Sequence, residues 1–180
     1  MTQLLEGFEY TPKLQKWEKL TVGNARAVCF IDGKLLLIKR VREGQTFYVL
    51  PGGRVDEGEN AREAVVRELR EEANVDVVVT RELYRVAARP GKFYFANLGI
   101  FLCEYKMGEI SKTDSPDEYA AGVENETHYD GRPKGTFEPV LLSVAQLKDV
   151  NIYPDNAVAQ LLVDIEKYGI HLTRPTKFIK

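Results

Sequence analysis

Residues 53–75, GRVDEGENAREAVVRELREEANV, constrain the fold more than any other part of this chain. Asn60 and Glu63 have the spacing of a capping box, in which each side chain satisfies a free backbone N–H of the other at the start of a helix. A helix is therefore predicted from Asn60 to Ala73. Its apolar residues share one side, which should bury against another layer; they are Val65, Val66, Leu69 and Ala73.

The sequence on either side of this helix has the pattern of β-strands. Apolar and β-branched runs occupy residues 25–31, 35–38, 46–50, 75–88, 92–105 and 137–142. Asp32-Gly33 between the first two runs is a strong signal for a tight hairpin. Ser143 and Gln146 predict a short capped helix, and a last helix is expected from about Pro154 to Gly169. Strands and helices in this mixed order predict an α/β sandwich.

Three glutamates of the first helix are expected to share one face. Glu68, Glu71 and Glu72 stand at i, i+3 and i+4, so their carboxylates are neighbours and repel one another. A hard divalent cation such as Mg²⁺ would remove that repulsion and would bind substrate phosphates as well. Ala61 and Ala64 are expected to leave room for a ligand above the carboxylates. The alternative is an ordinary solvated face of charged side chains.

The same segment resembles the Nudix box, which reads Gly, five residues, Glu, seven residues, then Arg-Glu-aliphatic-x-Glu-Glu-x-Gly-aliphatic. Eight positions agree in register: Gly53, Glu59, Arg67, Glu68, Leu69, Glu71, Glu72 and Val75. Asn74 replaces the family's second glycine. Asparagine is the next-best residue for a left-handed helix end, so the helix should still stop there. The resemblance covers residues 23–168.

The resemblance implies a Nudix-like α/β/α sandwich with a mixed β-sheet. It implies a metal site at Glu68, Glu71, Glu72 and the carbonyl of Gly52, for Mg²⁺ or alternatively Mn²⁺. Further implied roles are structural: an Arg67–Glu59 pair should hold the loop 53–59 against the helix, while Gly53 permits a tight turn.

The implied reaction is metal-dependent hydrolysis of the pyrophosphate bond in a nucleoside diphosphate linked to another group. That group could be of the ADP-ribose or nucleotide-sugar type, or the substrate could be a nucleoside triphosphate. Pro90 lies fifteen residues beyond Val75, a position that resembles ADP-ribose pyrophosphatases of this family. The alternative function is a non-catalytic, nucleotide-binding or sensor domain.

The general base and the substrate-binding residues are not assigned individually; each role has a set of candidates. Candidates for the base are the helix residues Glu71 and Glu72, and three acids of the polar stretch 111–135, namely Glu118, Glu124 and Glu126. Candidates for cationic contacts with the substrate are Arg26, Arg40, Arg54 and Arg89.

Charge and hydropathy limit the partners. The chain has 25 Lys and Arg against 27 Asp and Glu, so no overall positive field favours nucleic acid. No apolar run is long enough to span a bilayer, and no secretory signal is visible, so we expect a cytoplasmic protein without membrane partners. The two cysteines, Cys29 and Cys103, lie in apolar runs and are expected to be buried thiols.

The expected organisation is an N-terminal arm, residues 1–22, followed by a Nudix hydrolase domain, residues 23–180. The arm carries three aromatic residues but no apolar period; they are Phe8, Tyr10 and Trp17. Such a segment packs either on its own domain or on a second subunit, so a homodimer is one expectation.

Overall fold

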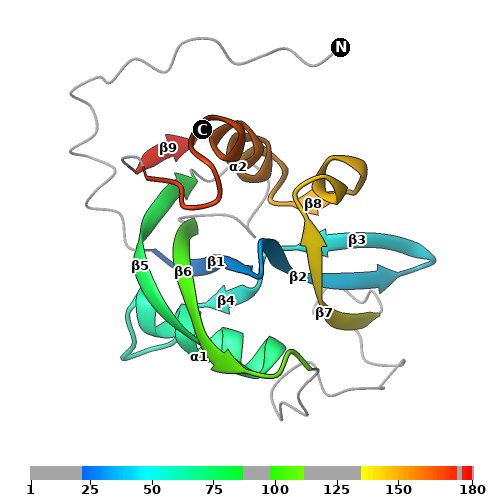
Figure 1. Ribbon diagram of the computed structural model, residues 1–180. Helices are drawn as coiled ribbons and strands as arrows, with labels where there is room; N and C mark the ends of the chain where they lie inside the picture. The colour runs from blue at the N-terminus through cyan, green and yellow to red at the C-terminus, as the bar shows by residue number, and fades with distance from the viewer. Residues whose placement is uncertain (1–21, 87–97, 112–134, 174–175, 180) are drawn as a thin grey trace.

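The computed structural model describes residues 22–86, 98–111, 135–173 and 176–179. Within these residues one mixed sheet lies between two helices. Helix α1 (Ala61–Ala73) covers one face of the sheet and α2 (Asp155–Tyr168) covers the opposite face (Figure 1). The predicted α/β/α sandwich with a mixed sheet is confirmed.

The central strand of the sheet is β1. The strands are β1 (Asn24–Ile31), β2 (Lys34–Arg42), β3 (Gln45–Val49), β4 (Gly52–Arg54), β5 (Val75–Val86), β6 (Leu98–Gly108), β7 (Thr136–Ser143), β8 (Ile152–Tyr153) and β9 (Lys177–Ile179). Their order is β8-β3-β2-β1-β6-β5-β9, with β4 also beside β1 and β7 also beside β2. One edge of β1 is therefore shared: β2 pairs with its end, at Phe30 and Ile31, and β4 pairs with its start, at Asn24 to Arg26.

Two hydrophobic clusters form the core, one on each face of the sheet. Ala25, Ala27 and Cys29 of β1 pack with α1, whereas Val28 belongs to the cluster beneath α2. This alternation follows from the two-residue period of a strand. Cys29 and Cys103 are free, buried thiols, as predicted. Burial raises the pKa of both thiols, that of Cys29 to about 12.

Most of the predicted elements are present. Asp32 and Gly33 form the expected hairpin turn with positive φ angles of 49° and 74°. The short helix after Ser143 is a 3₁₀ helix, Gln146–Asp149, and α2 ends at Gly169. Three short strands, β4, β8 and β9, were not predicted, since two or three residues carry no measurable period.

Several predictions fall outside the described residues. These are the arm up to residue 21, the turn at residues 89–91 and the polar stretch at residues 112–134. Among the helices that the structure does describe, none combines the length and the apolar character needed to cross a membrane.

Candidate active site

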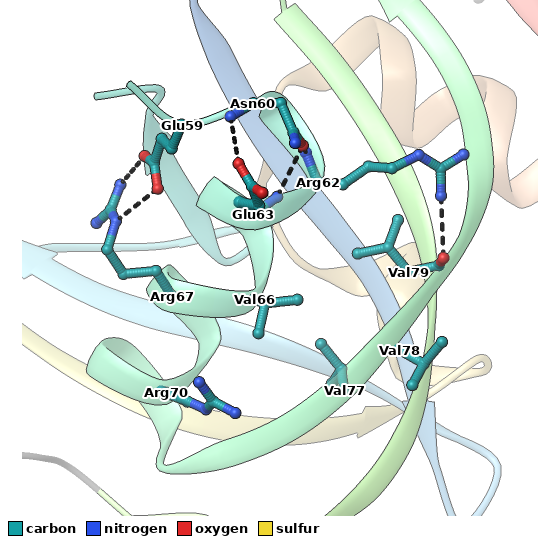
Figure 2. Close-up of a pocket in the computed structure, with 10 residues that line it drawn as sticks. All are labelled: Glu59, Asn60, Arg62, Glu63, Val66, Arg67, Arg70, Val77, Val78 and Val79. Atoms are coloured by element: carbon teal, nitrogen blue, oxygen red, sulfur yellow. Dashed lines mark hydrogen bonds and ion pairs between the residues drawn. The ribbon is translucent and has the colours of Figure 1, made fainter. Parts of the chain in front are cut away.

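Helix α1 has a fixed start and a fixed end, which set the positions of its glutamates. Asn60 Oδ1 accepts from the N–H of Glu63 at 3.1 Å, and Glu63 Oε2 accepts from the N–H of Asn60 at 2.7 Å (Figure 2). The capping box is thus complete. Asn74 ends the helix with φ 55° and ψ 40°, the left-handed conformation expected for it.

The side chain of Asn74 makes contacts that a glycine could not make. Its Nδ2 donates to the carbonyl of Glu109 at 3.1 Å and lies 3.2 Å from Ser111 Oγ. Ser111 N–H also donates to the carbonyl of Ala73 at 3.3 Å. The end of α1 is therefore bonded to the segment that follows β6, a link that sequence reasoning did not anticipate.

Gly52 and Gly53 bring the backbone of β4 against β1 and α1. Gly52 has φ 128°, and a Cβ there would overlap the carbonyl oxygen of Ala25. A Cβ on Gly53 would instead overlap the carboxylate of Glu68. The first glycine therefore permits the close pairing of two strands, and the second leaves space for a glutamate side chain.

Glu72 is held by a hydrogen bond from the backbone of β4. The N–H of Gly52 donates to Glu72 Oε2 at 2.7 Å. Burial raises the pKa of Glu72 to about 7. The charge of Arg26 opposes that rise, the repulsion from Glu68 adds to it, and the Gly52 hydrogen bond and Arg40 oppose it further. Burial also raises the pKa of Glu68, against the charges of Arg67 and Arg26.

Arg67 connects the loop before α1 to the glutamate face of the helix, which consists of Glu68, Glu71 and Glu72. It holds Glu59 with two hydrogen bonds, Nε to Oε2 at 3.2 Å and Nη2 to Oε1 at 2.7 Å (Figure 2). The expected Arg67–Glu59 pair is thus formed, and it lowers the pKa of Glu59. Arg67 Nη1 also contacts Glu68 Oε1 at 3.1 Å and Glu71 Oε2 at 3.0 Å, and its Nη2 donates to the carbonyl of Arg54 at 3.0 Å.

An open pocket lies on the other flank of α1, against β5 (Figure 2). Its lining consists of Glu59, Asn60, Arg62, Glu63, Val66, Arg67, Arg70, Val77, Val78 and Val79. None of Glu68, Glu71 and Glu72 is among these residues. The pocket therefore includes the Arg67–Glu59 pair but not the three glutamates of the proposed metal site.

The glutamate face fits a hard divalent cation by its chemistry. Three carboxylates and the carbonyl of Gly52 are all oxygen donors, which Mg²⁺ and Mn²⁺ prefer. In the part of the chain that the structure describes, no three His, Cys, Asp or Glu side chains already converge as a metal cluster. The reason is visible in the contacts, because Arg67 draws Glu68 and Glu71 while Gly52 holds Glu72.

The candidate substrate arginines occupy different environments. Arg26 donates from Nη1 to the carbonyl of Gly52 and, at 3.2 Å, to that of Leu50. Arg40 is 9% exposed in β2, and its charge acts on Glu72. Arg54 is exposed. Arg89 and the three loop glutamates, Glu118, Glu124 and Glu126, lie outside the described residues.

The expectation of open space beside Ala61 and Ala64 was wrong. Ala64 is fully buried in the cluster between α1 and the sheet, and Ala61 is partly buried against the same cluster. The small side chains therefore allow close packing of helix on sheet. The sequence did not predict the contact of Arg26 with Gly52. This contact depends on the pairing of β4 with β1, and β4 has only three residues.

Comparison with known proteins identifies a family. Residues 21–147 match the model of the NUDIX domain. A NAD-capped RNA hydrolase, NudC of Photorhabdus laumondii, is 34% identical over 102 residues, which are 57% of this chain and 37% of that protein. The chain thus spans well under half the length of this curated relative.

Solved structures share the fold at low identity. An ADP-ribose pyrophosphatase from Streptococcus suis superposes with a TM-score of 0.55 at 21% identity, covering 86% of this chain and 96% of that one. A UDP-X diphosphatase superposes with a TM-score of 0.58 at 16% identity, covering 92% and 73%.

Proposed function

The chain belongs to the Nudix hydrolase family, and we propose that it hydrolyses the pyrophosphate bond of a nucleoside diphosphate linked to a second group. The observation that carries this proposal is the arrangement around Gly52. Its N–H holds Glu72, and Glu68 and Glu71 lie on the same helix face, so three carboxylates and a backbone carbonyl are available as ligands for a phosphate-binding cation.

Nudix hydrolases generally use divalent metal ions, and we propose Mg²⁺ here, with Mn²⁺ as a substitute. Glu68, Glu71, Glu72 and the Gly52 carbonyl would hold it. Such an ion neutralises phosphate charge and lowers the pKa of bound water. In the metal-free protein Arg67 pairs with Glu68 and Glu71 while anchored on Glu59, so it balances their charge until a metal ion binds.

Support for this substrate class comes from the name of a curated relative. NAD-capped RNA, named for the Photorhabdus relative, contains an adenosine diphosphate joined to a second group. A substrate of the ADP-ribose or nucleotide-sugar type has the same bond. Nucleoside triphosphates are the rival class, and no described contact favours them. The proton acceptor is proposed to be one of Glu71, Glu72, Glu118, Glu124 and Glu126.

The test is a panel of substrates with and without Mg²⁺. ADP-ribose, NAD and UDP-sugars resist alkaline phosphatase until the pyrophosphate bond is cut, so phosphate released in its presence reports cleavage. Triphosphates are assayed separately with inorganic pyrophosphatase. Metal-dependent release from one of the linked diphosphates is expected. Binding of these ligands without any release would contradict the proposal and indicate a non-catalytic sensor.

A further inference from the structure

We propose that Arg26 is a built-in counter-ion of the metal site, which holds the Gly52 carbonyl in the metal-free protein and must be displaced from it when the metal binds. This inference rests on the proposed function, since it assumes that the glutamate face binds a divalent cation. It assigns Arg26 a role in setting metal affinity, in addition to any contact with substrate.

The Gly52 carbonyl, which we propose as a metal ligand, is already bonded to the guanidinium of Arg26. Arg26 and Gly52 are partners in the β1–β4 ladder. Arg26 Nη1 donates to the Gly52 carbonyl, and the N–H of the same glycine donates to Glu72. Both polar groups of Gly52 are thus engaged, one by a carboxylate and the other by a cation. A metal ligated by that carbonyl competes directly with Arg26.

The charges of the glutamate face are balanced from two sides. Arg67 contacts Glu68 and Glu71 from the loop side. Arg26 acts from the sheet side, and its charge favours the ionised forms of Glu68 and Glu72. The repulsion among these carboxylates is therefore already reduced in the metal-free protein.

The two guanidinium groups differ in how tightly they are held. Arg67 is anchored by a two-bond pair with Glu59, and charge-assisted pairs of this type are the strong ones. In the described residues, the hydrogen bonds of Arg26 go to two backbone carbonyls, those of Leu50 and Gly52. A neutral carbonyl holds a guanidinium less firmly than a carboxylate does. Arg26 is therefore the cation that a metal replaces.

The first test observes the Gly52 carbonyl in the wild-type chain. The fourteen glycines include a single adjacent pair, Gly52-Gly53. Protein labelled only with ¹³C′,¹⁵N-glycine therefore gives one carbonyl-to-amide correlation, from Gly52 C′ to Gly53 N–H. Titration with Mg²⁺ is expected to shift this peak as the carbonyl exchanges a guanidinium for a metal. An unmoved peak in a protein that demonstrably binds metal would overturn the inference.

The second test measures binding of Mn²⁺ alone, from the electron paramagnetic resonance signal of the free ion. Arg26→Gln removes the competitor, and Mn²⁺ should bind about tenfold tighter, as expected for loss of a hydrogen bond to a charged group. Arg26→Lys keeps a positive charge without the planar fork and should lie between the two. In chelator, Arg26→Gln should also lower the melting temperature.

Arg40→Gln is the matched control, because Arg40 also acts on Glu72 by its charge. Equal tightening in the Arg26 and Arg40 variants would mean that only the electrostatic field changed, and would overturn the competition. If an arginine variant fails to fold, the wild-type carbonyl titration still decides. Absence of any Mn²⁺ binding would overturn the proposed metal site and this inference together, whereas binding with an unmoved Gly52 peak overturns this inference alone.

Discussion

Glu72 and Asp164 are carboxylates shielded by the sheet, Glu72 in part and Asp164 almost fully, each on a helix that covers one face of that sheet, yet their surroundings differ. Asp164 of α2 is 1% exposed and accepts hydrogen bonds from Tyr84 Oη at 2.6 Å, Lys177 Nζ at 2.8 Å and Gln160 Nε2 at 3.1 Å. Glu72 of α1 accepts from a backbone N–H of Gly52, and the cations around it act mostly by their field.

The difference separates a carboxylate that is satisfied within the structure from one that we propose binds a metal ion. The partners of Asp164 come from β5, α2 and β9, so the charge locks three elements together. Glu72 is held in place but is incompletely compensated, as its raised pKa of about 7 indicates. A carboxylate in that condition gains from an added cation, whereas one that is already satisfied does not.

The largest expected effect is on turnover. Glu72→Gln keeps the shape and the Gly52 hydrogen bond but removes a negative charge from the proposed metal site. We expect the rate at saturating Mg²⁺ and substrate to fall by a factor of at least about 100, comparable to loss of a transition-state electrostatic contact. Glu166→Gln, at an exposed position of α2, is the control. Near-normal turnover in Glu72→Gln, with Glu71→Gln also active, would remove the metal assignment.

The reciprocal substitution should affect stability instead. Asp164→Asn weakens the hydrogen bonds from Tyr84 and Lys177 and should lower the free energy of unfolding by about 1 to 3 kcal/mol, the usual cost of losing hydrogen bonds to a charged group. Turnover per folded molecule should stay near wild type well below the melting temperature. Denaturant titration and active-site-normalised rates measure the two quantities. A folded Asp164→Asn protein with lost turnover would break the comparison.

A pH series tests the environment of Glu72 without an activity assay. The pKa of Glu72 is raised above the ordinary value of about 4.3, so the folded state binds its proton more tightly than the unfolded state does. The resulting stabilisation is complete at low pH and is lost as the pH rises through about 7.

Between pH 5 and 8 in chelator, wild type should therefore lose about 1 to 2 kcal/mol relative to Glu72→Gln, less than the whole shift because the nearby arginines and solvent screen the charge. Calorimetry of the two proteins measures this difference. Parallel curves would show that Glu72 does not titrate in this range.

The smallest effect is expected at the end of α1. Asn74→Gly restores the residue of the family pattern and relieves the left-handed strain of asparagine, but it loses the contacts with Glu109 and Ser111. These opposing terms should leave the free energy of unfolding within about 0.5 kcal/mol of wild type. Asn74→Ala loses the contacts and keeps the strain, so it should be less stable than Asn74→Gly. The reverse order would show that the asparagine contacts contribute nothing.

The sequence predicts α1 well because its signals are local. The capping box at Asn60 and Glu63, the spacing of the glutamates and the left-handed Asn74 all depend on residues within one helix. The contacts of Gly52 with Glu72 and Arg26 span 20 and 26 residues, and no local pattern specifies them. They require the pairing of β4 with β1, as the Asp164 network requires that β9 return to β5.

The pairing of β2 and β4 with the same edge of β1 also determines how a misfolded chain could be detected. Arg26 faces Gly52 only when β4 pairs with β1 in the observed register. A slip of β4 by one residue would bring an alanine, Ala25 or Ala27, opposite Gly52 and move the glycine carbonyl away from the arginine, whose own strand is held by β6. Such a chain could be compact and still bind no metal. The share of the melting transition that moves to higher temperature on adding Mg²⁺ would then measure the correctly paired fraction of a preparation.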